Sequence, residues 1–427
     1  MNVSEVNAPQ QLASIECTTL PPPTKKAKKT SGTDSVAPDQ TQPSISSAAI
    51  MKPVYVCSAG LRKVQPYWQV FQVHAKGRWF GRALDEVLTT EFPRLERKTY
   101  VVNAIKLGRI RVNGESVAKN YRIRDNDVIY HRYHRHERAV SDARIGIIHN
   151  DADMLVVNKP CSMPVHPCGA YHYNSVVKVL QHEYGWDNLR VLHRLDRNTS
   201  GCLLFARNLP TDQRLSRLFR EHKVHKLYLA KVDGEFPVSE SGDRITCDRP
   251  IRPIVRAMGI QCCSDDGKPT TTQFERVWAD GETSVVKCWP LTGRTHQIRV
   301  HLQYLGFPIV NDYLYNCEVF GPKKGAKSDY NGRTLEQLSI DLQEHHSFKS
   351  WVDYNEPPIE LKDVDVDNPK PETDDYDPYC VDCRVTKFDP KGSMLHMYLH
   401  CLRNWSDTFD YSTEWPEWAV EPTPTDR

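Results

Sequence analysis

The sequence VLHRLDRNTSGCLLFAR, residues 191–207, joins a charged turn to an apolar run. Asp196 stands between Arg194 and Arg197, and the turn Asn-Thr-Ser-Gly separates it from CLLFA. The apolar run predicts a buried strand, so Asp196 is expected in the loop that enters this strand. Nearby positive charge favours the carboxylate form, which suits a nucleophile, an electrostatic stabiliser or a weak base. A salt-bridged loop aspartate is the simpler alternative.

The sequence on either side of this segment alternates short strands with amphipathic helices. IGIIHNDADMLVVNKP (145–160) reads as two strands around a turn, whereas LSRLFREHKV (215–224) and THQIRVHLQYLG (295–306) read as helices. No glycine-rich nucleotide-binding pattern is present. These features predict an α+β catalytic domain over residues 141–355, with a mixed or antiparallel sheet flanked by helices and no nucleotide cofactor.

Residues 82–136 form a separate basic unit with twelve basic and seven acidic residues. RALDEVLTTEF (82–92) has helical spacing, and a second helix is expected to end at Gly108. Beyond this helix, Asn113 and Gly114 form a hairpin turn dipeptide. The pattern predicts a small α+β domain whose basic surface either binds RNA or is merely solvated.

The N-terminal tail and a late acidic stretch differ in composition from the rest of the chain. Residues 1–50 are rich in Ser, Thr, Pro and Gln and are expected to be disordered. Their basic cluster Lys25–Lys29 is either a nuclear localisation signal or a solvated charge run, so the predicted location is the nucleus, the cytoplasm or both. Residues 355–378 hold nine acidic and two basic residues, so the remainder of the chain carries +9. We therefore expect an acidic linker over 356–378 and a polyanion as partner of the basic body.

Residues 379–427 are expected to form a C-terminal extension that packs on the catalytic domain. The spacing of a two-Cys, two-His zinc finger is matched by Cys380, Cys383, His396 and His400. However, the residues from Met394 to Leu399 alternate in a way that favours a strand. We therefore expect no metal and incidental cysteines, with a zinc site as the alternative.

The overall composition, 39% hydrophobic and 26% charged, is typical of a soluble globular protein. No run of 18 apolar residues and no secretory signal pattern occurs, so neither a membrane span nor secretion is expected. The thirteen cysteines are expected to be mostly free thiols in a reducing compartment. We expect a monomer.

Four segments with a common order extend the pattern around Asp196. They are NKPCSMPVHP (158–167), HRLDRNTSGCLLFAR (193–207), KLYLAKVDG (226–234) and LTGRTHQIRVHLQYLGFPIVND (291–312). This ordered set resembles the RluA-type RNA pseudouridine synthases. AIKLGRIRVNG (104–114) followed by YRIRDNDVI (121–129) resembles the S4-like RNA-binding domain. Together the resemblance covers roughly residues 82–325 and implies an S4-like domain ahead of the catalytic domain.

The resemblance implies an isomerase that converts uridines within RNA to pseudouridine without a cofactor or a metal. Asp196 matches the essential aspartate of the family, which attacks the ribose or abstracts a ribose proton to give a glycal-type intermediate. Arg194 matches the residue that fills the space left by the flipped base. Tyr228 matches an aromatic residue that stacks on the uracil and moves a proton at carbon 5. Arg299 matches the arginine that pairs with the catalytic carboxylate.

Further residues have less specific assignments. Ile298 would give an apolar wall beneath the ring, and Lys226 and Arg294 would be structural or phosphate contacts. Arg109 and Arg111 would contact RNA from the basic turn of the S4-like domain. The expected partner is RNA, with transfer RNA favoured over ribosomal and messenger RNA. His193 and His296 are expected to be structural histidines.

Two other functions compete with this interpretation. A non-catalytic RNA-binding protein on the same scaffold is one, although such a copy is free to lose Asp196, Tyr228 or Arg299. A hydrolase with a lone carboxylate acting on a polyanion is the other, but it would need a second carboxylate or a metal cluster. No such set stands out in the sequence.

Overall fold

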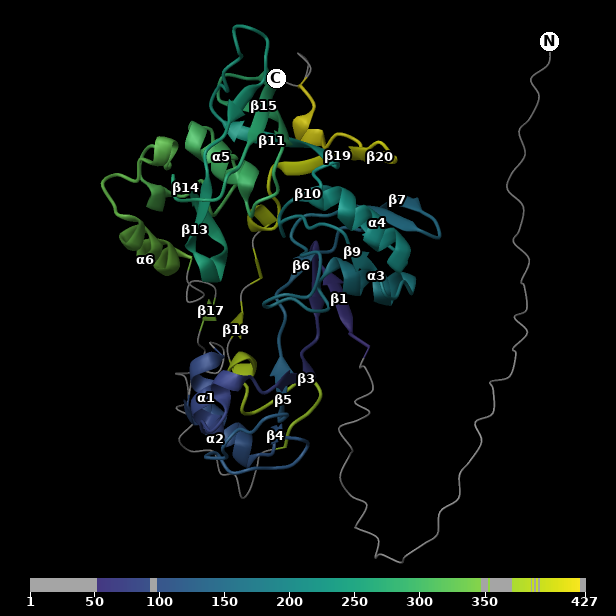
Figure 1. Cartoon of the computed structure of the whole chain (residues 1–427), viewed down its shortest axis with the longest axis vertical. Helices are drawn as coiled ribbons and strands as arrows, with labels where there is room; N and C mark the ends of the chain where they lie inside the picture. Colours follow the sequence, from purple (N-terminus) through teal and green to yellow (C-terminus); the bar gives the residue numbers. More distant parts are fainter. Residues whose placement is uncertain are drawn as a thin grey trace, which may run out of the picture. The chain divides into compact units, whose positions relative to one another are not determined.

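The computed structural model describes seven stretches of the chain (Figure 1). They are residues 52–92, 98–346, 352–353, 371–384, 386–387, 389–390 and 392–422. The expected N-terminal tail, its cluster Lys25–Lys29 and residues 356–370 of the acidic linker lie outside these stretches. None of the helices that the model describes is long and apolar enough to cross a membrane.

A ten-stranded sheet forms the centre of the catalytic domain. Its strands are β7 (Gly146–Asn150), β8 (Met154–Lys159), β9 (Arg190–Val191), β10 (Ser200–Ala206), β11 (His225–Asp233), β12 (Ile245–Cys247), β15 (Thr272–Ala279), β16 (Thr283–Pro290), β19 (Leu399–Ser406) and β20 (Phe409–Ser412). The order is β12-β15-β16-β11-β19-β10-β8-β7, with β20 beside β19 and β9 beside β10. All pairs are antiparallel except β10–β19. The predicted α+β class with a mixed sheet is therefore confirmed.

Strand β19 lies in the middle of this sheet although it comes from the C-terminal extension. It pairs with β10 on one side and β11 on the other, as Figure 1 shows for the yellow ribbon. The expected strand over Met394–Leu399 is wrong, because β19 begins only at Leu399. The predicted alternation of buried and exposed side chains is present, because Leu395 and Met397 are buried and His396 is exposed. The amide of Tyr398, however, donates to the Asn311 side chain instead of to a neighbouring strand.

Gly201 marks the close approach of β10 and β19. It pairs with Cys401 and has a φ of 111°, in the region that favours glycine. A Cβ atom on Gly201 would lie 2.3 Å from the carbonyl oxygen of Cys401. The glycine that ends the turn after Asp196 is thus needed for the central strand to pair.

The helices of the catalytic domain cover this sheet and a smaller ribbon. They are α3 (Val176–Tyr184), α4 (Leu209–Arg220), α5 (Gln297–Leu305) and α6 (Leu335–His345). Every residue of α5 from Gln297 to Gln303 is buried, including Arg299 and His301. The ribbon of β13 (Ile251–Val255) and β14 (Ile260–Cys263) packs with α6 around a second apolar core. Because α5 is enclosed between two cores, its polar side chains need partners inside the protein.

An α1–α2 unit, residues 67–135, has its own core. It contains β3 (Tyr67–His74), α1 (Leu84–Glu91), α2 (Lys98–Lys106), β4 (Ile110–Val112) and β5 (Val128–Arg135). The strands form an antiparallel sheet in the order β3-β5-β4. Both predicted helices are confirmed, and Gly108 and Gly114 have the positive φ that a helix end and a tight turn require. Trp79, Leu88 and Ile105 belong to the core that joins the helices to the sheet.

Two small sheets complete the described chain. β1 (Tyr55–Ser58), β2 (Leu61–Val64) and β6 (Val140–Ser141) pair in the order β1-β2-β6. β17 (Val352–Asp353) pairs with β18 (Thr386–Lys387).

We predict that Gly201→Ala lowers the free energy of unfolding by about 3 kcal/mol or more, because the new methyl group strains the backbone and collides with Cys401. Gly77→Ala is the matched control, since a Cβ there meets nothing within 4 Å and its φ is not positive. Urea unfolding followed by circular dichroism measures both. Equal stability of the two variants would contradict the assigned role of Gly201.

Candidate active site

Asp196 lies in the loop between β9 and β10, as the sequence predicts. Its side chain is 29% exposed, and its Oδ2 atom accepts a hydrogen bond from Arg299 Nη1 at 3.2 Å. The loop is closed on itself, because the amide of Thr199 donates to the Asp196 carbonyl at 3.1 Å. A carboxylate that is open to solvent on one side and held by a cation on the other can meet a substrate without losing its charge.

Arg299 is held by Asp312 rather than by Asp196 alone. Its Nε and Nη2 atoms donate to the two oxygens of Asp312 at 2.6 and 2.7 Å, and both side chains are buried. Asp312 also accepts hydrogen bonds from the amides of Leu314 and Tyr315. This bidentate pair fixes the guanidinium so that its remaining Nη1 points at Asp196. Asp312 closes the segment LTGRTHQIRVHLQYLGFPIVND, but sequence reasoning gave it no role.

The Asp196 carboxyl is more acidic than an ordinary aspartate. Burial by itself raises its pKa, but His296 in its protonated form, the charge of Arg299 and the Arg299 hydrogen bond outweigh this, so the pKa lies below its usual value. Burial and the neighbouring Arg299 lower the pKa of His296 to about 4, so this imidazole is neutral near pH 7. Arg299 is therefore the cation that keeps Asp196 ionised at neutral pH.

The two histidines expected to be structural differ in the structure. His193 accepts a hydrogen bond from the Leu204 amide at 3.2 Å and stacks on Phe219, which agrees with a structural role. His296, by contrast, has its Nε2 atom 3.7 Å from Asp196 Oδ2 and its Nδ1 2.8 Å from the Tyr315 hydroxyl. His296 also has a φ of 55°, which is uncommon for a residue other than glycine. His296 therefore lies beside Asp196, and its assignment as a structural histidine stays a prediction.

Lys159 holds the loop that carries Asp196 through three backbone contacts. It is fully buried, and its ammonium donates to the carbonyls of Pro160, Met163 and Arg197 at 2.8, 2.8 and 3.0 Å. Burial lowers its pKa to about 7, whereas the three carbonyls favour the charged form. The bond to the carbonyl that follows Asp196 fixes that turn. The lysine stands in NKPCSMPVHP, a segment whose function sequence reasoning left open.

Tyr228 and Ile298, predicted to hold the uracil, lie in the apolar core. Both are buried and belong to one hydrophobic cluster, Tyr228 from β11 and Ile298 from α5. Burial raises the pKa of Tyr228 well above its usual value, and Cys401 and Asp196 add to the effect. The raised pKa keeps the phenol protonated at neutral pH.

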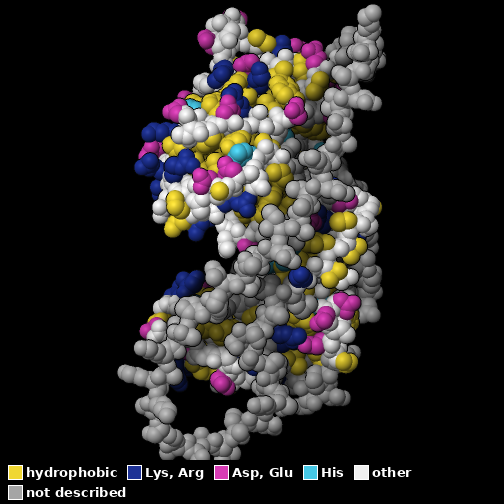
Figure 2. Space-filling model, turned by 90° about the vertical axis from the view of Figure 1, so that its right-hand side faces the viewer, with side chains coloured by type: hydrophobic (Ala, Val, Ile, Leu, Met, Phe, Trp, Pro, Cys, Tyr) yellow, Lys and Arg dark blue, Asp and Glu magenta, His cyan; other side chains and the backbone are white. Residues whose placement is uncertain are grey.

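Three predicted RNA contacts have different settings. Arg194 is exposed and forms no ion pair within the described residues. Lys226 is half-buried on β11, with its ammonium 5.4 Å from the Phe219 ring centre. Arg294 is exposed and lines a cavity of about 890 Å³ together with three further cations, Arg252, Arg256 and Lys268. Figure 2 shows Lys and Arg side chains interspersed with acidic ones on the face it presents, so positive charge is not spread uniformly over that face.

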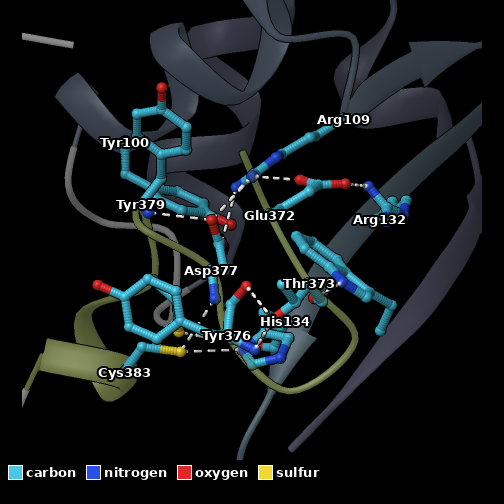
Figure 3. Close-up of polar contacts among 12 residues, drawn as sticks. Tyr100, Arg109, Arg132, His134, Glu372, Thr373, Tyr376, Asp377, Tyr379 and Cys383 are labelled. Atoms are coloured by element: carbon cyan, nitrogen blue, oxygen red, sulfur yellow. Dashed lines mark hydrogen bonds and ion pairs between the residues drawn. The ribbon is translucent and has the colours of Figure 1, made fainter. Parts of the chain in front are cut away.

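Arg109 is not available to RNA, and its prediction is corrected. It is buried and donates to both oxygens of Asp377 at 2.8 Å and to Glu372 at 2.8 Å (Figure 3). The rings of Trp68 and Tyr379 lie on its guanidinium at 4.9 and 5.2 Å. The reason is that residues 371–378 of the acidic stretch, and Tyr379 after them, fold onto the α1–α2 unit.

Arg111 has a different setting from Arg109. It is half-buried, and its Nε donates to the Gly108 carbonyl at 3.0 Å. Its Nη atoms have no ion pair within the described part of the chain. A contact between Arg111 and RNA therefore stays a prediction.

Known proteins resemble this chain over most of its length. A family model described as RNA pseudouridylate synthase matches residues 153–304. Pseudouridylate synthase RPUSD2 of Homo sapiens is 36% identical and aligns with 86% of this chain and 75% of its own. RNA pseudouridine synthase 7 of Oryza sativa subsp. japonica is 34% identical and aligns with 86% of this chain and 92% of its own. The mitochondrial tRNA pseudouridine(32) synthase of Saccharomyces cerevisiae is 34% identical, with 86% and 78% aligned.

We predict that Asp312→Asn is far more destabilising than Asp196→Asn. Asp312→Asn breaks a buried ion pair, which costs about 3–5 kcal/mol of unfolding free energy. Asp196→Asn removes one contact from a partly exposed carboxylate and should cost about 1 kcal/mol or less. Thermal and urea unfolding compare the two. An equal loss in both would mean that Arg299 depends on Asp196 for its place.

Proposed function

Because the chain belongs to the RluA-type RNA pseudouridine synthases, isomerases that convert uridine in RNA to pseudouridine, we propose that it modifies transfer RNA through Asp196. The observation that carries this proposal is the chain of contacts from Asp312 through Arg299 to Asp196. It presents one ionised and partly exposed carboxylate beside a buried aromatic residue, Tyr228.

The reaction needs an unprotonated carboxylate beside the ribose. The glycosidic bond of the uridine breaks, the uracil turns over, and carbon 5 rejoins the ribose. Asp196 acts as a nucleophile on the ribose or abstracts a ribose proton to give a glycal, and both routes require its negative charge. Arg299 keeps Asp196 negatively charged for either route, because it lowers the pKa of Asp196. The scheme uses side chains alone and calls for no cofactor.

Tyr228 and Ile298 hold the uracil while it is detached. Their burial in one apolar cluster gives the flat ring a place to stack. The raised pKa of Tyr228 keeps its hydroxyl protonated, so stacking is its first role. Its second role is to relay the proton that leaves carbon 5: as the hydroxyl accepts that proton, it gives its own proton to the Asp196 carboxylate, which is free again once carbon 5 has joined the ribose.

Arg194 compensates for the flipped nucleotide. A base inside an RNA helix must leave the stack to reach Asp196, at a cost of a few kcal/mol. Arg194 is exposed, two residues from Asp196 and without an ion pair in the described chain, so it is free to enter the space. A planar cation there stacks on neighbouring bases and attracts phosphate.

Basic groups away from the centre bind the RNA backbone. We assign the α1–α2 unit to the S4-like domains because its two helices lead into a basic strand and hairpin. Lys106, Lys119 and Arg124 are exposed there and form no ion pair among the described residues. In the catalytic domain, the cavity lined by Arg294 offers a second phosphate site.

Transfer RNA is proposed as the substrate because a yeast relative is named for a tRNA position. The test is to map pseudouridines in RNA from cells with and without this protein. Sites lost from ribosomal or messenger RNA, and not from transfer RNA, would identify a different substrate. The nucleus and cytoplasm are the proposed locations, although the same relative is named mitochondrial. A non-catalytic RNA-binding protein would leave the pseudouridine map unchanged.

We predict that Asp196→Asn abolishes turnover while RNA still binds, because the variant keeps its shape and Arg194. The assay is release of tritium from uridine labelled at carbon 5, in RNA that the wild-type protein modifies. Asp187→Asn, an exposed aspartate nearby in the sequence, is the control and should retain full activity. Tyr228→Phe should bind RNA but form no pseudouridine. Normal tritium release by Asp196→Asn would refute the mechanism.

We predict that reversing two exposed charges on the α1–α2 unit weakens binding without slowing chemistry. Lys106→Glu with Lys119→Glu should raise Kd at least about tenfold and lower the salt dependence of log K by about 0.7–0.9 per lost phosphate contact. Lys106→Arg with Lys119→Arg keeps both charges and is the control. Turnover at saturating RNA should stay at the wild-type value. Unchanged Kd in the reversed variant would remove this surface from the RNA interface.

A further inference from the structure

Four potential metal ligands meet in the α1–α2 unit, away from the residues of the active site. They are His134 and His136, at the end of β5, and Cys380 and Cys383, from the C-terminal extension. One ligand atom from each residue lies within 4.8 Å of the others. Figure 3 shows Cys383 turned toward His134 across the two segments. The extension has thus returned to the strand from a distant place in the sequence.

We propose that these four residues form a structural zinc site. His134 Nδ1 lies 3.1 Å from His136 Nε2, and each of these atoms lies 3.2 Å from Cys383 Sγ. A tetrahedron with zinc bonds of about 2.0–2.3 Å has edges of about 3.3–3.8 Å, close to these distances. Two thiolates and two imidazoles form a donor set that zinc prefers and that magnesium and calcium do not.

Hydrogen bonding alone does not explain the cluster. Three atoms, two ring nitrogens and one sulfur, face one another at 3.1–3.2 Å. His134 Nε2 lies 3.3 Å from the Asp374 carbonyl, which can only accept, so Nε2 carries the ring proton in the neutral form. His134 Nδ1 is then a bare lone pair directed at the cluster. A cation at the centre satisfies all the lone pairs together.

The surroundings have the outer contacts of a metal site. The Asp374 carbonyl orients His134, and the amide of Asp377 donates to Cys383 Sγ at 3.3 Å. The Trp68 ring lies 5.1 Å from the His134 ring and covers one side. Four protein ligands leave no open position, which indicates a structural and not a catalytic centre.

The alternative ligands suggested by sequence spacing are engaged elsewhere. His400 uses both nitrogens, with Ser200 Oγ at 2.8 Å and Thr413 Oγ1 at 2.6 Å. His396 is exposed, and its Nδ1 lies 3.0 Å from the Gly392 carbonyl. Cys380 and Cys383 therefore lie beside two histidines from earlier in the sequence, His134 and His136, and not beside His396 and His400.

The proposed zinc ion anchors the segment that leads to β19. It would hold residues 377–383 to β5 beside the Arg109–Asp377 ion pair, so the two contacts reinforce each other. This inference is independent of the RNA target and of the catalytic role of Asp196.

The first test is the metal content of the full-length chain, purified without added chelator and measured by elemental mass spectrometry. We expect one zinc per chain. Cys380→Ser with Cys383→Ser should lose the metal, whereas the control His396→Asn should keep it. Less than about 0.2 zinc per wild-type chain, or full zinc in the double serine variant, would overturn the proposal.

A second measurement covers the case in which the double variant does not fold. Cobalt replaces zinc in the wild-type chain, and its visible spectrum reports tetrahedral geometry and thiolate ligation. We expect tetrahedral bands with sulfur-to-cobalt charge transfer, and their loss in His136→Asn but not in His136→Cys. An octahedral spectrum in the wild-type chain, or an unchanged spectrum in His136→Asn, would rule out the four-residue site.

Discussion

The pairing of β19 with both β10 and β11 is the contact on which the rest of the molecule depends. Within the described sheet, β19 alone joins the four strands from β12 to β11 to the group around β10. Asp196 lies just before β10, and Tyr228 on β11 pairs with Cys401 of β19. Gly201 lets the three strands meet. The proposed catalytic carboxylate, Asp196, and the proposed stacking ring, Tyr228, therefore come from opposite sides of a strand contributed by the C-terminal extension.

Two carboxylates, Asp312 and Asp196, contact the same arginine, Arg299, in different ways. Asp312 is buried and accepts hydrogen bonds from two backbone amides as well as from Arg299, so its carboxylate is paired entirely within the protein. Asp196 receives a single bond from Arg299 and remains partly exposed. The same cation thus holds the buried carboxylate in place and lowers the pKa of the other, so Asp196 stays ionised although it is only partly exposed.

Local patterns predicted local structure well, because helices and hairpins are encoded by neighbouring residues. The helices of the α1–α2 unit and the strand after Asp196 were anticipated in this way, whereas the Arg299–Asp196 contact was expected only from the resemblance to a known family. The place of β19, the Arg299–Asp312 pair and the burial of Arg109 were not, since each joins residues whose partners the sequence does not reveal. His134 and His136, the proposed ligands, did carry a signal: they lie two residues apart, His134 in β5 and His136 directly after it, a spacing that in extended chain puts side chains on the same face.

The central position of β19 has a consequence for synthesis on the ribosome. β10 and β11 leave the exit tunnel well before residues 399–406, so each presents an unpaired edge while translation continues. Until β19 emerges, neither half of the sheet can close, and the nascent chain offers these edges to other strands. The order in which these strands are made has two consequences. The nascent chain needs chaperone protection during that interval, and the enzyme has no activity until the chain is nearly complete.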